Sequence, residues 1–405
     1  MLFKNYILYN FTSGTYESSN STTTVSSTIE TAPGIVISNP SGSLMINGKK
    51  KLVSIAAGGL NYNNLIDGTP VGISIEPAVT YLSGYSQPTV AQTTTVSGMS
   101  DATIPTGETG NWQTVTTIGT QGFSYQTISV TAGTDYWQQF EIIMDDGSLP
   151  VPFNTASTGG DFSIVFDGTA NVSKNPDTGA AGFKIIGPLS GGKYIVQAYF
   201  TASITQSGNY GIIKYTGQSS KNFYIGRRNA GTGRYPSSMF DNATSTPNTR
   251  STDRVYQTIS GFDAGQITII GEFVCPNPSS TYLAPCHLSK DGTNYIVSRF
   301  QGGGYPFTVV VAVTSLSDVT INSQSNLIAG TKYKFVVVIN TANKTISLKI
   351  AGMAIVSSAL TASIGVPTQF EIGSYANTYK LNSSIGMIGL FDRSWSTNEM
   401  NAWAG

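Results

Sequence analysis

The sequence predicts an all-β protein with two β-sandwich or jelly-roll domains that follow an N-terminal β arm. Three observations predict this class. Short runs rich in Val, Ile, Tyr and Thr recur along the chain, separated by clusters of Gly, Pro, Asn, Asp and Ser. Long helical periodicity is nearly absent. The chain has 405 residues, more than one hydrophobic core usually serves, so we expect two or three domains.

The low charge of the chain limits its classes of partner. Charged residues make up 11% of the sequence, against about 25% in typical domains. Lys plus Arg and Asp plus Glu number 22 each, so there is no basic excess to bind a nucleic acid backbone. Thr, Ser, Asn and Gly fill the polar positions, which is typical of extracellular or virion β-proteins with neutral, hydroxyl-rich surfaces.

The sequence argues against membrane insertion and against a signal peptide. No apolar run approaches the length of about 18 residues that a membrane span needs. The stretch MLFKNYILYNFTSG lacks a sustained apolar core and is polar by Asn10. We therefore expect assembly in a host cytoplasm and release by lysis, as for a virion protein, although a signal-independent export route would also fit.

Residues 1–58 are expected to form the arm, with two or three strands. Ser and Thr dominate it, as in SSNSTTTVSSTIETAP. Asn47-Gly48 is a hairpin-turn signal, and the basic triplet Lys49–Lys51 follows it. Such an arm would anchor the chain to a larger assembly or mediate oligomerisation.

Residues 59–250 are expected to form the first sandwich. Strand patterns recur in GISIEP, WQTVTTI, SYQTISV, YWQQFEIIM, FSIVF, GFKIIGPL, KYIVQAYFTAS and GIIKYTG. Turn clusters such as DDGSLP and NPDTGAAG separate them, which favours a sandwich or jelly roll. The stretch from Arg227 to Val255 is rich in Gly, Pro, Ser, Thr and Arg, and we interpret it as a linker.

Residues 251–405 are expected to form the second sandwich. Its strand patterns are QITIIGEFVC, YIVSRF, FTVVVAVT, YKFVVVIN, TISLKIAG, FEIGSY and IGMIGLFD. The continuous VVVAV and FVVVI runs predict strands that are covered on both faces. Near the end, Ser396 and Glu399 have the capping-box spacing, which predicts a helical turn.

The two cysteines and the single histidine restrict the chemistry. Cys275 and Cys286 flank a turn-rich segment, and two thiols alone do not define a disulfide framework. They are either reduced thiols or a disulfide formed after release. His287 lacks the further ligands that a metal site needs. Because histidine is the usual base in Ser-His-Asp and Cys-His catalytic arrangements, a single histidine excludes most of them.

Residues 72–86 read GISIEPAVTYLSGYS and match the form G-[IL]-x-[IV]-E-x-A-x-T-x-L-x-x-Y-S. The matching positions are Gly72, Ile73, Ile75, Glu76, Ala78, Thr80, Leu82, Tyr85 and Ser86. The pattern resembles the opening of a carbohydrate-binding-module-like sandwich found in phage head-spike and tail-fibre proteins. YWQQFEIIMDDG and SGGKYIVQAYFTAS are similar to later strands of that module. Its closing segment is similar at Gly226, Gly231, Tyr235, Pro236, Ser237, Arg250 and Asp253.

Residues 261–405 resemble a laminin-G-like, concanavalin-type jelly roll. LSKDGTNYIV, AGTKYKFVVVI, TISLKIAG and FEIGSY are similar to strands of that family. The end of the chain is similar to the family's terminal motif at Gly386, Ile388, Leu390, Phe391, Arg393, Ser396, Glu399 and Met400. Together the resemblances imply a head fibre, tail fibre or capsid decoration subunit with lectin-like sandwiches that contacts glycans. They also imply a trimer or dimer attached to capsid or tail proteins.

A sugar site needs an aromatic platform with hydrogen-bonding groups beside it. The residues expected to bind carbohydrate in the first sandwich are Trp112, Tyr136, Trp137, Tyr199 and Tyr210. A structural calcium ion is an open alternative, with Asp161, Asp167 and Asp263 as its candidate ligands, and no other cofactor is expected. Arg227, Arg228 and Arg234 make the linker locally basic, either as solvated residues or as contacts to an acidic glycan or virion surface.

Two other classes remain open. A glycan depolymerase needs two carboxylates across the scissile bond. Asp145 and Asp146 are adjacent and precede Gly147, so we interpret them as a turn, and Glu76 as a framework residue. We therefore expect no enzyme and no catalytic residue. The other class is a purely structural capsid or tail decoration protein without a ligand.

Overall fold

A computed structural model describes most of the chain. The described residues are 5–20, 24–28, 32–33, 35–38, 43–46, 52–55, 62–64, 70–75, 79–82, 84–87, 89–92, 95–97, 99–102, 108, 110–115, 122–150, 152–156, 162–166, 182–202, 205–214, 223–233, 239, 242, 249–250, 253–262, 265–276, 283–300, 306–375, 379–381 and 383–405.

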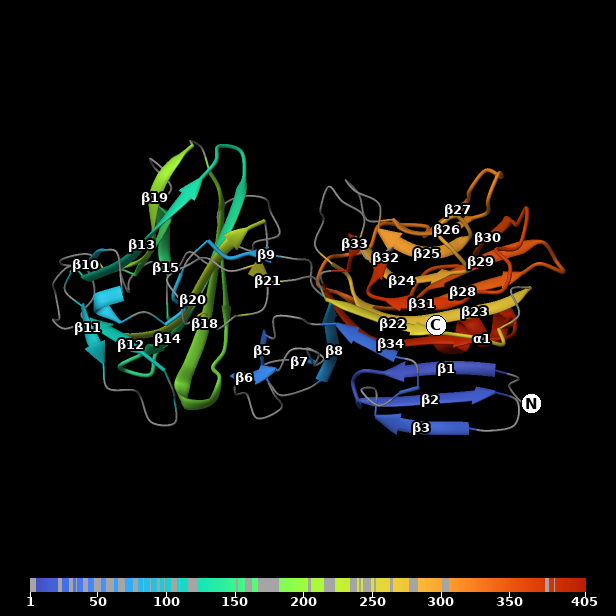
Figure 1. Cartoon of the computed structure of the whole chain (residues 1–405), viewed down its shortest axis with the longest axis horizontal. Coiled ribbons are helices and arrows are strands. Elements are labelled where there is room, and N and C mark those ends of the chain that lie inside the picture. Colours follow the sequence, from blue (N-terminus) through green and yellow to red (C-terminus); the bar gives the residue numbers. More distant parts are fainter. Residues whose placement is uncertain are drawn as a thin grey trace.

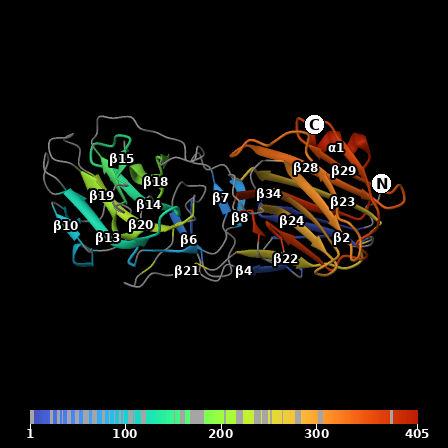
Figure 2. The ribbon, with the colours of Figure 1, turned by 90° about the horizontal axis from the view of Figure 1, so that it is seen from above.

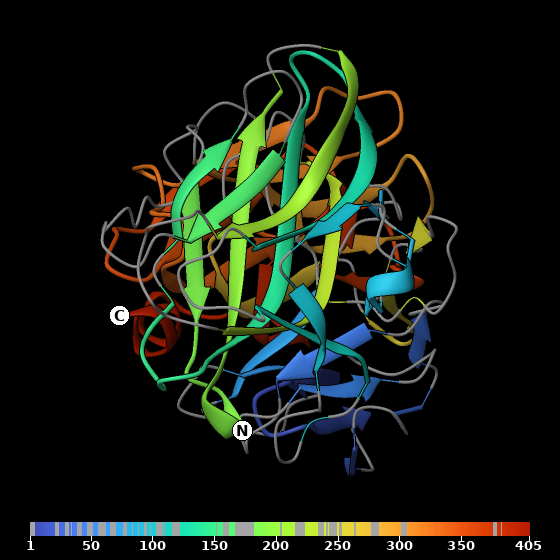
Figure 3. The same ribbon diagram turned by 90° about the vertical axis from the view of Figure 1, so that its left-hand side faces the viewer.

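Two β-sandwiches lie side by side along the long axis of the molecule (Figures 1 and 2). A view along that axis places the smaller sandwich in front of the larger one (Figure 3). The all-β class predicted from the sequence is confirmed. The strand pairs are antiparallel except for β16 with β19 and β24 with β33, among the strands that the structure describes.

The larger sandwich consists of a ten-stranded and a nine-stranded sheet. The ten-stranded sheet has the order β3 (Thr24–Thr28), β2 (Thr15–Asn20), β1 (Asn5–Asn10), β34 (Ser383–Phe391), β23 (Gln266–Val274), β28 (Lys332–Asn340), β29 (Thr345–Ile350) and β30 (Val356–Ala359), with β8 (Pro70–Ile75) and β7 (Tyr62–Asn64) beside β34. The nine-stranded sheet has the order β27 (Val319–Asn322), β26 (Phe307–Ala312), β25 (Tyr295–Phe300), β24 (Leu283–Ser289), β31 (Gln369–Ile372), β22 (Arg254–Thr258) and β4 (Ile35–Ser38), with β33 (Tyr379–Lys380) and β32 (Ser374–Tyr375) attached at β24.

The smaller sandwich consists of a six-stranded and a five-stranded sheet. The six-stranded sheet has the order β11 (Met99–Ala102), β12 (Trp112–Val115), β20 (Phe223–Thr232), β14 (Asp135–Met144), β18 (Lys193–Thr201) and β17 (Gly182–Ile186). The five-stranded sheet has the order β10 (Thr95–Ser97), β13 (Gly122–Val130), β19 (Gln206–Lys214), β16 (Phe162–Phe166) and β15 (Pro152–Ala156). Short 3-10 helices span Val90–Gln92 and Ser190–Gly192.

The larger sandwich is built from both ends of the chain. Strand β1 pairs with β34, β4 pairs with β22, and β8 pairs with β34. Strands β1 to β4, which the sequence analysis assigned to a separate arm, are therefore strands of this sandwich. The reason is burial, because Ile7, Tyr9, Phe11 and Tyr16 lie in its core.

The smaller sandwich is inserted into the larger one. The chain leaves β8 after Ile75 and returns at Arg254, the first residue of β22. Between these points, β9 (Val79–Thr80) pairs antiparallel with β21 (Thr249–Arg250), so the outgoing and returning segments run beside each other. The stretch 72–86, expected to open the first sandwich, thus begins in the larger sandwich and ends in the smaller one, where the backbone N–H of Leu82 donates to the carbonyl of Ala230 (2.8 Å). Glu76 and Pro77 lie outside the described residues.

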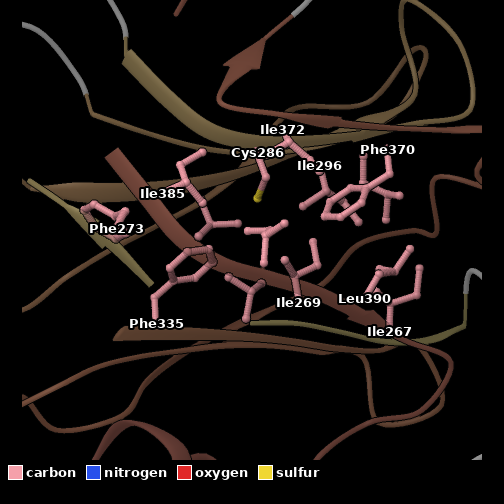
Figure 4. Packing of buried hydrophobic residues seen from close by; sticks show 14 of the residues in the cluster. Ile267, Ile269, Phe273, Cys286, Ile296, Phe335, Phe370, Ile372, Ile385 and Leu390 are labelled. Atoms are coloured by element: carbon pink, nitrogen blue, oxygen red, sulfur yellow. The ribbon is translucent and has the colours of Figure 1, made fainter. Parts of the chain in front are cut away.

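The core of the larger sandwich lies between its two sheets (Figure 4). Ile269, Phe335 and Leu390 come from the ten-stranded sheet, and Ile296 and Phe370 from the nine-stranded sheet. Phe273 stacks on Phe307 across the core with ring centroids 5.4 Å apart. The continuous apolar runs predicted to be covered on both faces are confirmed, since all six residues of β26 are buried.

The two cysteines are free and buried. Burial raises the pKa of each thiol to about 12. The open question between reduced thiols and a disulfide is thus answered in favour of reduced thiols in this structure. The segments on either side of the predicted hairpin turn, β5 (Ser43–Ile46) and β6 (Leu52–Ile55), pair antiparallel, whereas Asn47 and Gly48 themselves lie outside the described residues.

Helix α1 (Thr397–Ala404) confirms the predicted capping box. The backbone N–H of Ser396 donates to the Glu399 carboxylate (2.7 Å), and the backbone N–H of Glu399 donates to the Ser396 hydroxyl (3.4 Å). Met400 and Ala404 bury against the outer face of the ten-stranded sheet. Within the part of the chain that the structure describes, no helix has the length and apolar character needed to cross a bilayer.

Candidate functional site

Three of the five aromatic residues expected to bind sugar are buried in the smaller sandwich. Trp112 and Tyr136 are 1% and 3% exposed, and Trp137 is fully buried. Tyr136 faces the core, and its hydroxyl accepts a hydrogen bond from the backbone N–H of Thr131 (2.7 Å). Trp137 lies on the opposite face of β14, where the ring of Tyr81 meets it edge-on at 6.0 Å. Their ring faces are therefore not available for stacking against a sugar.

Two glycines of β20 fit closely against these indole rings. A Cβ atom at Gly226 would lie 2.8 Å from Trp112, and one at Gly231 would lie 2.5 Å from Trp137. The backbone of β20 can pass this close to the rings only without side chains at these positions. Both glycines belong to the predicted closing segment of the module, so that part of the motif has a packing role.

Several other residues singled out from the sequence lie, wholly or in their side chains, outside the described part of the structure. Tyr199 lies in β18 and Tyr210 in β19, but their side chains lie outside the described part of the structure. The calcium candidates Asp161, Asp167 and Asp263 are also outside it, as is Arg234. Among the residues that are described, no group of three or more His, Cys, Asp or Glu side chains could hold a metal ion.

Glu141 lies at the centre of a buried ion network in the smaller sandwich. Its carboxylate is 3.0 Å from Nζ of Lys193 and 3.2 Å from Nη1 of Arg227, and the backbone N–H of Arg227 donates to it (3.0 Å). Lys193 also contacts Glu108 at 2.7 Å. Two acidic and two basic groups balance each other, so burial of the charges is compensated.

The predicted linker over Arg227–Val255 is wrong at its start. Arg227 and Arg228 lie inside β20, a strand with neighbours on both sides. Arg227 binds Glu141, and Nη2 of Arg228 donates to the side-chain oxygen of buried Gln113 (3.2 Å). These two arginines are framework residues. The predicted turn at Asp145–Gly147 is confirmed, since Ser148 N–H donates to the Asp146 carboxylate (3.0 Å).

The outer face of the nine-stranded sheet, which points away from the core, carries a different group of residues. The strand registers align one row of seven residues across this face: Val36, Tyr256, Glu371, His287, Val297, Val310 and Thr320. Val36 and Thr320 at the ends of the row are exposed, whereas Glu371, His287, Val297 and Val310 in the middle are buried. Side chains above the middle of the row must therefore cover it.

Two tyrosines contribute to this cover. Tyr295 and Tyr375 are partly exposed and pack with buried Ala284, Val297 and Val310. The centroids of their rings are 5.2 Å apart. Both rings stand edge-on to the imidazole of His287, with a centroid distance of 5.4 Å for Tyr295 and 4.9 Å for Tyr375. We call Tyr295, Tyr375, His287, Glu371 and Arg254 the tyrosine–histidine cluster.

Glu371 provides the negative charge of the tyrosine–histidine cluster. It accepts a short hydrogen bond from the hydroxyl of Ser374. Its carboxylate is 3.5 Å from Nε of Arg254 and 3.5 Å from Nδ1 of His287. Arg254 also stacks its guanidinium on the ring of Tyr256 at 4.1 Å. The cluster thus joins aromatic surface, a carboxylate and a cation on one face of a rigid sheet.

This arrangement has the parts that a sugar site needs. Partly exposed aromatic rings lie beside polar groups, and a sheet holds both in place. The cluster could not be predicted from the sequence, because its members lie on β22, β24, β25, β31 and β32, which meet only through strand pairing. The one available signal was His287, an isolated polar ring in an otherwise apolar strand pattern.

No known protein-family model matches the sequence. No curated protein matches it either. Among solved structures, the chain is similar to the CBM40 module of the Ruminococcus gnavus IT-sialidase bound to α2,3-sialyllactose, with TM-score 0.31 and 15% identity over 37% of this chain and 96% of that chain. It is also similar to a SAP-like pentraxin from Limulus polyphemus, with TM-score 0.30 and 10% identity over 38% and 76% of the two chains.

A third similar structure is domain 4 of AbnA, an extracellular arabinanase of Geobacillus stearothermophilus, in complex with arabinotriose. The TM-score is 0.31 and the identity 12%, over 38% of this chain and 73% of that chain. With TM-scores near 0.3, the function of this chain has to be argued from its own residues.

Proposed function

We propose that the protein is a glycan-binding protein and that the tyrosine–histidine cluster is its binding site. The observation that carries the proposal is the pairing of partly exposed Tyr295 and Tyr375 with the buried polar groups of His287 and Glu371. Aromatic faces bind the C–H surfaces of sugars, and buried polar groups orient their hydroxyls. Surface aromatics that are fixed by a sheet lose little conformational entropy on binding.

A glycan array followed by binding measurements on two variants tests this proposal. Tyr295→Ala and Tyr375→Ala should each weaken binding of any glycan hit at least about tenfold, because each removes a ring of the platform. Tyr6→Ala is the matched control, since Tyr6 is a partly exposed tyrosine on the ten-stranded sheet. Loss of binding in the control, or unchanged binding in both cluster variants, would contradict the assignment.

We propose further that the protein acts as a virion fibre, spike or decoration subunit that is assembled in a host cytoplasm. The neutral, hydroxyl-rich composition and the order of the sequence motifs support this role. The expected partners are capsid or tail proteins and further copies of the chain, as a dimer or trimer. Electron cryo-microscopy of the native particle tests the role directly, because the chain would then occupy defined positions in the density.

We also propose that the protein binds without turnover. In the smaller sandwich, the carboxylate of Glu141 is fully buried and paired with Lys193 and Arg227, so a substrate could not reach it without breaking this ion network. Glycan hydrolysis by the purified chain that is abolished by Glu141→Gln, with the fold retained, would contradict this. A glycan array without hits would instead favour a purely structural decoration protein.

A further inference from the structure

The imidazole of His287 has unused hydrogen-bonding capacity. Its side chain is 8% exposed, and within the described part of the structure neither ring nitrogen has a hydrogen-bond partner. The nearest charged group is the Glu371 carboxylate, 3.5 Å from Nδ1, which is beyond a well-formed hydrogen bond. A buried polar group without a partner is unfavourable, because it has lost its hydrogen bonds to water without replacement. Such groups in folded proteins commonly bind a water molecule or a ligand.

The surroundings of His287 show which side the partner would come from. His287 lies in β24, whose residues are all buried, and the buried residues Ala284 and Val297 pack in the same cluster as the two tyrosines. Tyr295 and Tyr375, which stand edge-on to the imidazole, are partly exposed, as is Arg254 on the far side of Glu371's ion pair. A group that reached the imidazole nitrogens would therefore pass beside these two rings. The two tyrosine rings would at the same time contact the apolar face of the ligand molecule that carries this group.

The charge next to His287 restricts what that group can be. Glu371 is 1% exposed and lies beside the imidazole, and the cation of the cluster, Arg254, is already paired with it, so a ligand carboxylate or sulfate in the same place would meet a buried carboxylate without gaining a free cation. A hydroxyl can donate to one acceptor and accept from one donor at the same time. It therefore suits an imidazole that has a carboxylate as its neighbour.

We infer that His287 is the specificity-determining contact of this site and that it selects uncharged sugars through their hydroxyl groups. This inference rests on the proposed glycan-binding function. Tyr295 and Tyr375 supply the general affinity for a sugar face. His287 with Glu371 discriminates between a neutral sugar and one that carries an acid group.

The single histidine of the chain makes the contact directly observable. In the chain of 405 residues, the histidine ring 1H–15N correlations come from one residue and need no assignment. The probes are maltotriose, cellotriose and arabinotriose as neutral trisaccharides, and trigalacturonic acid as the acidic one. We expect at least one neutral trisaccharide to shift the His287 resonances on binding. We expect trigalacturonic acid to bind at least about tenfold more weakly than that trisaccharide.

Two variants complete the test. His287→Phe keeps an aromatic ring between the tyrosines but removes both nitrogens, and His287→Gln keeps hydrogen-bonding groups without the ring. We expect His287→Phe to lose about tenfold in affinity for the neutral trisaccharide and with it the preference over the acidic one. His287→Gln should retain more affinity than His287→Phe. Melting temperatures of both variants check that the fold is intact.

The possible outcomes separate this inference from the proposed function. Unchanged binding by His287→Phe, together with loss of binding in Tyr295→Ala, overturns the role of His287 and leaves glycan binding in place. Tighter binding of trigalacturonic acid than of every neutral probe, with shifted His287 resonances, also overturns the inference alone. Absence of binding to every probe on the array and in solution overturns the proposed function and the inference together.

Discussion

The hydroxyl of Tyr9 donates a hydrogen bond to the side-chain amide oxygen of Gln257, a residue 248 positions later in the chain. Gln257 in turn donates to the hydroxyl of Tyr16 (3.1 Å) and to the carbonyl of Pro33 (2.6 Å). Tyr9, Tyr16 and Gln257 are all buried. This polar network in the core joins the N-terminal strands to the first strand after the inserted sandwich.

Removal of the Tyr9 hydroxyl should destabilise the larger sandwich. Tyr9→Phe leaves the amide oxygen of Gln257 buried without its donor, which is unfavourable by about 1–3 kcal/mol. Tyr6→Phe is the control, because Tyr6 donates to Glu17 in an exposed position and its loss should change stability by less than about 0.5 kcal/mol. Urea denaturation of both variants measures the difference. Equal stability of the two variants would argue against a buried network.

Alkaline pH should weaken the larger sandwich through its buried thiols. Burial raises the pKa of Cys286 to about 12, so the folded state keeps the proton that the unfolded thiol loses above about pH 8.5. The stabilising contribution is present below that pH and is lost as pH rises towards 12. Each such thiol lowers the free energy of unfolding by about 1.4 kcal/mol per pH unit in this window.

Cys286→Ala isolates this contribution. The variant should be less stable than the parent at pH 7, because it leaves a small cavity, yet its stability should fall less steeply between pH 9 and pH 11. Burial and the nearby Tyr16 also raise the pKa of Tyr9 well above its usual value, so some alkaline loss remains in the variant. Identical slopes for variant and parent would mean that the thiol ionises equally easily in the folded state.

Gly226→Ala should destabilise the smaller sandwich. Its Cβ would lie 2.8 Å from the indole of Trp112 and 2.9 Å from Glu141, so ring and ion network would both have to shift. We expect a loss of about 1–3 kcal/mol, as for other overpacked cores. Gly292→Ala is the matched control, because a Cβ there meets nothing within 4 Å. Tryptophan fluorescence during denaturation follows the change, and a neutral Gly226→Ala would show that the indole is free to move.

The cap of helix α1 should be sensitive to acid and to mutation. Hydrogen bonds from Arg393 and from the backbone of Ser396 lower the pKa of Glu399 to about 2. The carboxylate therefore stabilises the helix above about pH 4.3, the pKa of a glutamate in the unfolded chain, and this contribution is lost as pH falls towards 2.

Ser396→Ala should weaken the docking of α1 by about 1 kcal/mol. Hydrogen exchange at Met400 reports on it, and unchanged protection would contradict the capping role.

The sequence predicted individual elements well where the signal is local. The strand predicted at YWQQFEIIM is confirmed as β14, and the spacing of Ser396 and Glu399 is confirmed as a capping box. Both depend only on residues within a few positions of one another. The all-β class follows from many such local signals.

The sequence did not predict which strands pair with one another, because strand pairing is not local. Nothing near Tyr9 indicates that its partner is Gln257, and the Ser/Thr-rich composition of the N-terminal strands looked like an arm. The burial of Trp112 and Trp137 depends on β20 and on Tyr81, which are distant in the chain. Residue types alone could not separate these framework rings from Tyr295 and Tyr375.

The insertion of the smaller sandwich has a direct consequence for fragments. Thr80 and Thr249 are paired neighbours in β9 and β21, so a two-residue Asn-Gly turn can join them in place of residues 81–248. This deletion variant should fold cooperatively, because both ends of the chain that build the larger sandwich are present. A fragment of residues 251–405 lacks β1, β4 and β8 and should not fold alone. A well-folded 251–405 fragment would contradict the shared sheets.

The central claim is that the larger sandwich, assembled from both ends of the chain, carries the ligand-binding face. The most direct measurement is the affinity of the deletion variant for a glycan that the full-length chain binds. We expect the dissociation constant to agree with that of the full-length chain within about twofold, since every member of the tyrosine–histidine cluster is retained. Loss of binding in a deletion variant that is folded by circular dichroism would place the site in the smaller sandwich and contradict the claim.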